Sequence, residues 1–125
     1  MTAGPQKQGA PRRLKKRSEF LRAARGRRAG GPSFSLQATA GDRAEPGVGF
    51  TVTNKTGNAP VRNRIRRRLR EAVRACATRL EPQHDYVLIG RREALKTPFG
   101  ELVDELSAAI TKIHASKAER RRNER

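Results

Sequence analysis

The sequence predicts an α+β fold in which helices lie on one small β-sheet. Three observations lead to this expectation. Between Val61 and Val73 the apolar residues recur every three or four positions, which is the spacing of a helix with one buried face. Residues 33–40 and 48–53 alternate apolar and polar side chains, as half-buried strands do. The unbroken apolar run at 86–90 indicates a strand in the centre of the sheet.

The composition indicates a single basic domain that binds a polyanion. The chain has 125 residues, a net charge of +17 and only 34% hydrophobic residues, so its core is small. Such a charge favours partners whose phosphates release counterions on binding. No apolar run is long enough to cross a membrane, and the start of the chain lacks the apolar region of a secretory signal. Because Cys76 is the single cysteine, an intramolecular disulfide is excluded, and we expect a cytoplasmic protein.

The first part of the chain predicts an arm, a short helix and a hairpin. Residues 1–13 are rich in Gly, Pro and basic residues and are expected to form a disordered basic arm. Ser18 is the expected N-cap of a helix whose favourable first turn contains Glu19. The two strands follow, and the Gly- and Pro-containing segment 41–47 between them is expected to close a hairpin.

The helix after this hairpin carries the strongest functional signal. Asn58 is its expected N-cap, and Pro60 stands in the first turn, where a missing N–H costs little. Eight arginines, at positions 62, 64, 66, 67, 68, 70, 74 and 79, face the single acid Glu71. Like charges repeated every four residues destabilise a helix unless a polyanion neutralises them. A solvated charged face is the ordinary interpretation of such a run, but the missing acids favour a nucleic-acid interface.

The second half of the chain predicts a strand, a helix and a tail. Residues 81–85 break the arginine helix before the central strand. A last helix is expected from near Thr97 to about Ala115, and residues 116–125 are expected to form a disordered basic tail. The folded part is therefore predicted to be one RNA-binding domain, residues 14–115.

Few residues could carry chemistry. His84 is expected in an exposed loop, His114 at a frayed helix end, and Cys76 as a small buried side chain. Neither histidine has the Cys or acidic spacing of a zinc site. No catalytic residue and no metal site is therefore predicted. The turn 55–58 leads into a helix N-terminus, whose free N–H groups can bind an anion.

The arginine helix and its preceding turn resemble the signature of the bacterial ribonuclease P protein component. The similar run extends from Lys55 to Arg67, with Arg62-Asn63-Arg64 at its centre. Residues 14–20, 48–52 and 85–89 fit the same family pattern. The resemblance covers about residues 12–113.

This resemblance implies a specific topology. The family's element order is αβββαβα, with about four strands and three helices. A short strand near Arg27–Gly30 is implied, although its residues alone would not predict one. The βαβ crossover is expected to be left-handed, against the usual rule.

The resemblance also implies the protein subunit of a ribozyme. The family's RNA subunit removes the 5′ leader from precursor tRNA and uses magnesium ions, so the protein alone is expected to be inactive and to bind no cofactor. Its implied partners are the catalytic RNA and precursor tRNA, with no DNA and no membrane. The arginine helix would bind the RNA subunit through Arg62, Asn63, Arg64, Arg66, Arg67, Arg68 and Arg70. A cleft between the first helix and the sheet would bind the single-stranded leader and its phosphates through Lys16, Arg17, Phe20, Gln37, Thr51, Lys55 and Asn58.

The chain departs from the family pattern within this cleft. Ala24 stands where a second aromatic residue is common, Gln37 where tyrosine often lies, and Asn54 where a basic residue is usual. Phe20 matches the first aromatic residue of the family's helix. It has two interpretations, because it either stacks on a leader base or packs with Leu21 in the core.

Other functions share some of these features. A ribosomal or other structural RNA-binding protein would have the same charge and size without a role in cleavage. A DNA-binding module would need helix-turn-helix geometry, whereas residues 81–85 lead into a strand. A membrane-surface protein is disfavoured by the absence of tryptophan. A stand-alone nuclease would cleave RNA without any RNA subunit.

Overall fold

The computed structural model describes residues 11–123, and the side chains of residues 11–115. It confirms the α+β class. Its elements are β1 (Arg12–Arg13), α2 (Arg17–Ala24), β2 (Arg27–Gly30), β3 (Phe34–Ala40), β4 (Gly47–Thr51), η1 (Asn54–Thr56), α3 (Ala59–Ala75), η2 (Ala77–Arg79), β5 (His84–Gly90), η3 (Arg92–Leu95) and α4 (Phe99–Asn123). After β1 the order of α-helices and strands is the αβββαβα that the resemblance implied, including β2. None of the helices in the described range has the length and apolar character that crossing a membrane requires.

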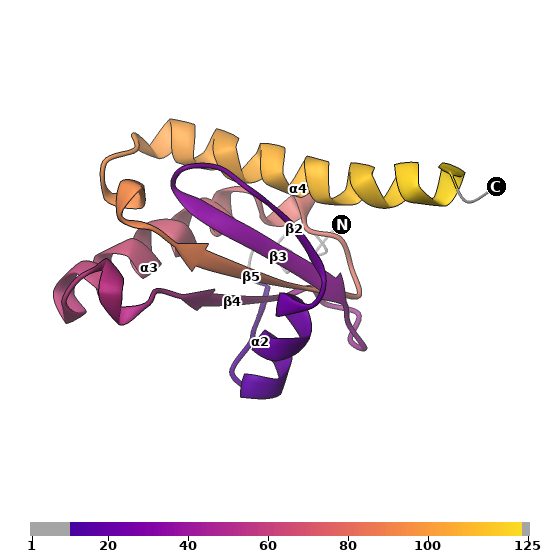
Figure 1. The fold of residues 1–125 in the computed structure, drawn as a ribbon, viewed down its shortest axis with the longest axis horizontal. Helices are drawn as coiled ribbons and strands as arrows, with labels where there is room; N and C mark the ends of the chain where they lie inside the picture. The colour runs from indigo at the N-terminus through magenta and orange to yellow at the C-terminus, as the bar shows by residue number, and fades with distance from the viewer. Residues whose placement is uncertain (1–10, 124–125) are drawn as a thin grey trace, which may run out of the picture.

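The strands form one mixed sheet in the order β1-β4-β5-β3-β2 (Figure 1). As predicted for residues 86–90, β5 is the central strand, parallel to β4 and antiparallel to β3. The predicted hairpin closed by residues 41–47 is wrong, because β5 lies between the two strands that this segment joins. The hairpin of this sheet is β2–β3 instead, closed at Gly31, whose N–H donates to the carbonyl of Phe34 at 3.1 Å.

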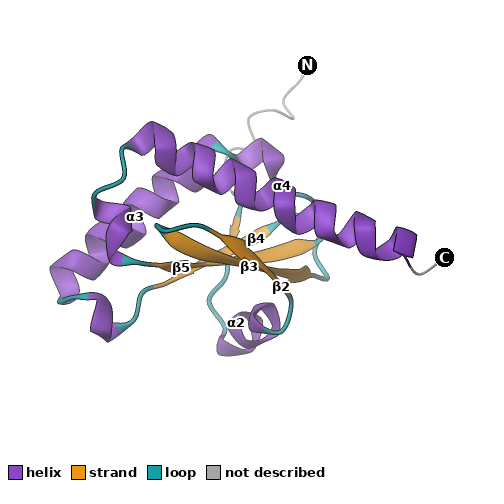
Figure 2. Cartoon of the chain, turned by 45° about the horizontal axis from the view of Figure 1, so that its top comes forward, coloured by secondary structure: helices purple, strands orange, loops and turns teal. Residues whose placement is uncertain are grey.

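The helices lie on both faces of the sheet, as Figure 2 shows. α3 and α4 cover one face, and α2 lies on the other. The main core fills the space between the sheet and the helices α3 and α4; its largest buried side chains include Phe34, Leu36, Ile65, Leu69, Tyr86, Leu88, Leu102, Leu106, Ile110 and Ile113. A second, smaller cluster under α2 contains Leu14, Ala23 and Val87, with Phe20 and Ile89 packed against it.

The connection from β4 through α3 to β5 is a βαβ crossover between parallel strands. In Figure 1 both strands point to the left, β5 lies above β4, and α3 passes behind the sheet. With α3 toward the viewer and both strands pointing up, β5 therefore lies to the left of β4. The crossover is left-handed, as the resemblance implied and against the usual preference.

Both ends of the folded domain reach further than predicted. Arg12 and Arg13 are not part of a disordered arm, because they pair with Gly47 and Val48 as β1, which adds a fifth strand to the predicted four. α4 does not stop near residue 115 but continues to Asn123. The residues after 115 include Ala, Lys, Glu and Arg and no Gly or Pro, which favours helix. Residues 1–10 of the predicted arm and 124–125 of the predicted tail lie outside the described range.

Candidate nucleic-acid interface

α3 begins as the sequence predicted and buries the predicted stripe. The Asn58 side chain accepts a hydrogen bond from the Val61 N–H at 3.1 Å, which caps the helix. Ile65 and Leu69 are fully buried against the sheet. Since these two residues fix the inward face, the positions between them point outward or sideways.

The outward face of α3 is a concave, strongly basic surface. Asn63, Arg64 and Arg67 are exposed, and the half-buried Arg66 donates from Nη1 to Asn63 Oδ1 at 2.9 Å. A hollow of about 390 Å³ is lined by Pro60, Asn63, Arg64, Arg66, Arg67 and Arg70. Guanidinium groups around a hollow suit phosphate oxygens, which accept two parallel N–H bonds from each fork. We call this surface the α3 face.

Arg70 connects the α3 face to the edge of the sheet. Its guanidinium carbon lies 5.7 Å from the ring centroid of Phe50, a cation–π distance. A second hollow, of about 130 Å³, contains Phe20 of α2 together with Arg66 and Arg70 of α3, and its remaining lining residues are Arg13, Leu14, Gly49 and Phe50. The predicted RNA-subunit set and the predicted leader set therefore meet in one hollow, which we call the junction hollow.

Phe20 is positioned by a glycine on the neighbouring strand. A Cβ atom added to Gly49 would lie 2.6 Å from Cζ of Phe20, closer than atoms can pack, so the ring occupies the space that a side chain would take. The ring is half-buried, packs against the small cluster of Leu14 and Val87, and also lines the junction hollow. The core interpretation needs one correction, because the ring packs with this cluster and not with Leu21, which is 50% exposed. Stacking of a leader base on the same ring stays a prediction. The hollow lies at the edge of the sheet, where Phe20 from the α2 side meets Phe50 and Arg70 from the α3 side.

The start of α2 differs from the prediction by two residues. Lys16, not Ser18, is the N-cap. The reason is Glu19, whose carboxylate accepts hydrogen bonds from the backbone N–H groups of Lys15 and Lys16, at 3.1 Å each. The Lys16 hydrogen bond is the main cause that lowers the pKa of Glu19 from its usual value, and Arg12 also lowers it. This arrangement leaves Lys16 and Arg17 exposed at the helix N-terminus.

Arg68 was assigned to the RNA-binding set, and in the structure its guanidinium group donates hydrogen bonds within the fold. Its Nε donates to the Ala94 carbonyl at 2.8 Å, and its Nη2 donates to the Thr97 carbonyl. On a helical projection it lies on the flank of α3 opposite to Arg66 and Arg70, so it meets η3 rather than the α3 face. The structure therefore gives Arg68 a structural role, while its place in the RNA-binding set stays a prediction.

Three other predicted residues are engaged or enclosed. Arg62 is half-buried and donates from Nη1 to Asn54 Oδ1 at 2.5 Å, so the asparagine that replaces the family's basic residue accepts from an arginine. The Asn58 oxygen is used for the helix cap. Gln37 of β3 is buried, with only 4% of its surface exposed, so it contributes almost nothing to the molecular surface.

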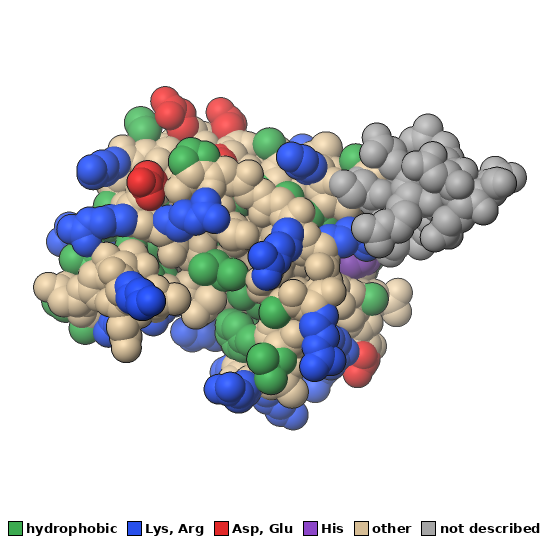
Figure 3. All heavy atoms as spheres, viewed as in Figure 1, with side chains coloured by type: hydrophobic (Ala, Val, Ile, Leu, Met, Phe, Trp, Pro, Cys, Tyr) green, Lys and Arg blue, Asp and Glu red, His purple; other side chains and the backbone are tan. Residues whose placement is uncertain are grey.

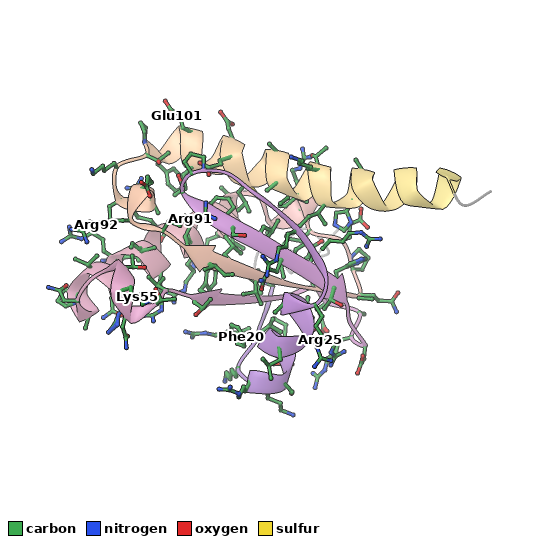
Figure 4. All side chains as sticks on the ribbon, viewed as in Figure 1. Phe20, Arg25, Lys55, Arg91, Arg92 and Glu101 are labelled. Carbon is green, nitrogen blue, oxygen red and sulfur yellow. The ribbon has the colours of Figure 1, made fainter. Side chains whose placement is uncertain are left out.

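The remaining leader candidates spread along the α2 side of the molecule. Thr51 is half-buried at the end of β4, and Lys55 is exposed in η1. Figure 4 shows Phe20 beneath the sheet and Lys55 towards its left end, with Arg92 of η3 nearby. Arg92 donates to the Thr56 carbonyl at 2.8 Å and so holds η1 in place. In Figure 3 the side chains of Lys and Arg are spread across the visible face, whereas the fewer acidic side chains lie mainly at the top, over the start of α4, with one at the lower right.

Two residues that line hollows of the interface, Arg13 and Phe50, were not predicted as site residues. Arg13 and Phe50 line the junction hollow, and both also line a neighbouring hollow of about 160 Å³ that contains Arg74. Arg13 was assigned to the arm, and nothing in two consecutive arginines signals a strand. The alternation of β4 correctly directs Phe50 towards the main core, but it cannot show that this ring reaches the sheet edge beside Arg70.

Comparison with known proteins gives a consistent result. The family model described as Ribonuclease P matches residues 9–114. The chain is 47% identical to the ribonuclease P protein component of Brucella suis over 121 aligned positions, covering 87% of this chain and 82% of that protein. It is 49% identical to the corresponding protein of Ruegeria pomeroyi over 109 positions, covering 83% of this chain and 87% of that one.

Solved structures share the fold. The RNase P protein of Staphylococcus aureus superposes with a TM-score of 0.67 at 24% identity, covering 83% of this chain and 98% of that one. The RNase P protein of Thermotoga maritima gives a TM-score of 0.65 at 24% identity, covering 75% and 90%. At this level of identity the likeness concerns the fold.

Proposed function

The chain belongs to the ribonuclease P protein family, and from this membership we propose which tasks the protein and the RNA subunit each perform. Its role is that of the protein subunit of ribonuclease P, and a ribosomal protein is not favoured, since family model and relatives agree. We propose that the RNA subunit performs the cleavage, with magnesium ions held by RNA. The protein binds that RNA and precursor tRNA, which places it in the cytoplasm.

The α3 face supports binding to the RNA subunit. Arg64 and Arg67 are exposed, Arg66 and Arg70 line the same hollow, and the described part of α3 carries one acid, Glu71, which pairs with Arg74 at 3.6 Å. Folded RNA places phosphates at close spacing, so a rigid row of guanidinium groups gains several contacts from one helix.

The junction hollow is the observation that carries the leader assignment. Two aromatic rings and three arginines around one opening match single-stranded RNA, because bases stack on the rings while phosphates meet the guanidinium groups. The same hollow adjoins the α3 face through Arg66 and Arg70. A leader that enters here is therefore held next to the RNA subunit.

Reconstitution tests this division of work. Cleavage of precursor tRNA is measured with the full-length protein alone, the catalytic RNA alone, and both together, at low and high magnesium concentration. We expect no cleavage by the protein alone, cleavage by RNA alone only at high magnesium, and cleavage by the mixture at both. The reason is that a protein of charge +17 replaces part of the divalent screening between phosphates.

Charge-matched variants sharpen the reconstitution. The double variant R64A/R67A removes two exposed charges from the α3 face and should lose the low-magnesium stimulation. As the control, R64A is combined with K112A in α4, which removes the same total charge but only one from the α3 face, and should retain more of it. Cleavage by protein free of RNA would contradict the proposal outright.

A further inference from the structure

Three side chains that can bind a metal ion lie close together, on the side of the main core that is opposite to η1 and η3. Glu81, His84 and His114 each offer one ligand atom, and these atoms lie within 4.8 Å of one another. Both predictions for the histidines are corrected here. His84 is the half-buried first residue of β5, not part of an exposed loop, and the longer α4 places His114 well inside a helix, where it is also half-buried.

His84 is held in the tautomer that can bind a metal. Its Nδ1 lies 2.9 Å from the Pro82 carbonyl oxygen. A carbonyl oxygen only accepts, so Nδ1 carries the proton in this contact and Nε2 keeps its lone pair. A backbone carbonyl that orients one ring nitrogen while the other binds the ion is the usual support of a metal-ligating histidine.

His114 is oriented by Tyr86 towards Glu81. Its Nε2 lies 2.8 Å from the Tyr86 hydroxyl, whose oxygen also accepts from the Glu81 N–H at 2.9 Å. Nδ1 of His114 lies 3.6 Å from Glu81 Oε1. Two ligands of one tetrahedral Zn²⁺ stand about 3.4 Å apart, given metal–ligand bonds of about 2.0–2.1 Å, so this pair already has nearly the required spacing.

The turn that joins Glu81 to His84 is fixed in an uncommon conformation. Gln83 has φ of 60°, the left-handed region that residues other than glycine rarely adopt. Two hydrogen bonds hold it there: its N–H donates to the Ala44 carbonyl at 3.1 Å, and its carbonyl accepts from the Gly41 N–H at 2.8 Å. The β3–β4 connection thus keeps Glu81 and His84 on the same side of the turn.

We propose that Glu81, His84 and His114 bind one Zn²⁺ ion, which fastens α4 to the turn before β5. Two imidazole nitrogens and one carboxylate are the donor set of a three-ligand zinc site with an open fourth position. Mg²⁺ and Ca²⁺ prefer sites made of oxygen ligands and fit less well. Since none of the three residues lines a hollow of the interface, this site is independent of the proposed function.

Zinc titration of the full-length protein without RNA tests the site. Calorimetry with ZnCl₂ should give one ion per chain, and Zn²⁺ should raise the melting temperature because it binds the folded state. Co²⁺, used as a spectroscopic substitute, should give the visible absorption of a low-coordinate nitrogen and oxygen site. H84Q, H114Q and E81Q should each weaken zinc affinity by more than about tenfold.

The controls separate coordination from folding. E71Q removes an exposed acid of α3 and should bind zinc like the unmodified chain. If H114Q unfolds because Tyr86 loses its partner, H84Q still decides, since the His84 ring contacts the Pro82 carbonyl and otherwise lies beside the rings of Tyr86 and His114. Absent zinc binding in the unmodified chain, or equal affinity in H84Q, would overturn the site.

Discussion

Phe20 serves the core and the junction hollow at once, and a mutation can separate the two contributions. Replacing Phe20 by leucine keeps an apolar side chain over Gly49 but removes the π-face on which a base stacks. Phe20→Ala removes both the packing and the stacking. Comparing the two variants therefore distinguishes a structural role from RNA recognition at a single position.

We expect Phe20→Leu to weaken binding of precursor tRNA by about 1–3 kcal/mol, the contribution of one base stacked on an aromatic ring. Binding of mature tRNA should change little, because that product has no leader. Equilibrium binding of both RNAs to the reconstituted holoenzyme measures the difference. Leu21→Ala, at a side chain 50% exposed on the same helix, is the control. Equal losses for the two RNAs would end the leader assignment of Phe20.

Two neighbouring arginines of α3 should behave in opposite ways. Arg64 is exposed on the α3 face, so Arg64→Ala should reduce the salt dependence of RNA binding by about one charge and leave the melting temperature nearly unchanged. Arg68→Ala deprives the Ala94 and Thr97 carbonyls of their donors and should lower the free energy of unfolding by about 1–3 kcal/mol.

Denaturant unfolding and RNA binding at several salt concentrations measure both effects on the same two proteins. The pair is its own control, because each variant removes one positive charge from the same helix. A lower salt slope for Arg68→Ala with unchanged stability would contradict the structural role. An unchanged slope for Arg64→Ala would show that this side of α3 is merely solvated.

At the scale of elements, α2 depends on a carboxylate. Hydrogen bonds from backbone N–H groups lower the pKa of Glu19, so its charged form stabilises the folded state. This contribution is complete above the usual value of 4.5 and is lost as pH falls through the lowered pKa of the folded state. The start of α2 and the exposed basic residues beside it should therefore loosen in acid.

Thermal melting of Glu19→Gln against pH tests this dependence. At neutral pH the unmodified chain should be the more stable, and the two curves should converge as pH falls below 4.5 through the lowered pKa of Glu19, because a protonated Glu resembles Gln. Glu19→Ala lacks the hydrogen-bond acceptor as well and should stay less stable than both at every pH. Parallel curves for the unmodified chain and Glu19→Gln would show that the charge of Glu19 contributes nothing.

The elements also show where sequence patterns are sufficient. α3 was predicted with its cap and buried stripe because both signals are local: Asn58 sits at the start, and Ile65 and Leu69 repeat at helical spacing. β1 was missed because two arginines have no alternation, and the partner that makes them a strand is Gly47–Val48. Ser18 was mistaken for the N-cap of α2 because a serine is the more common cap than the lysine that Glu19 makes possible.

For the whole molecule, the errors share one cause. The hairpin at residues 41–47 was wrong, since alternation marks strands but not their neighbours, and β5 comes from much later in the chain. The structural partners of Arg68 were not foreseen, because Ala94 of η3 and Thr97 after it are brought next to α3 by no sequence pattern. Likewise, His84 and His114 stand 30 positions apart and meet only in three dimensions. The family resemblance supplied β2 and the left-handed crossover, but neither the strand order nor these contacts.

The central position of β5 in the sheet has a consequence for folding during synthesis. During synthesis β1 and β4 emerge before β5, as do β2 and β3, and neither group has a ladder to the other until residues 84–90 leave the ribosome. Folding therefore waits for non-local pairing, which is slow. Until then the arginine-rich nascent chain exposes unpaired strand edges close to the RNA of the ribosome. The N-terminal two thirds of the chain can therefore complete their sheet only after the last third has been synthesised.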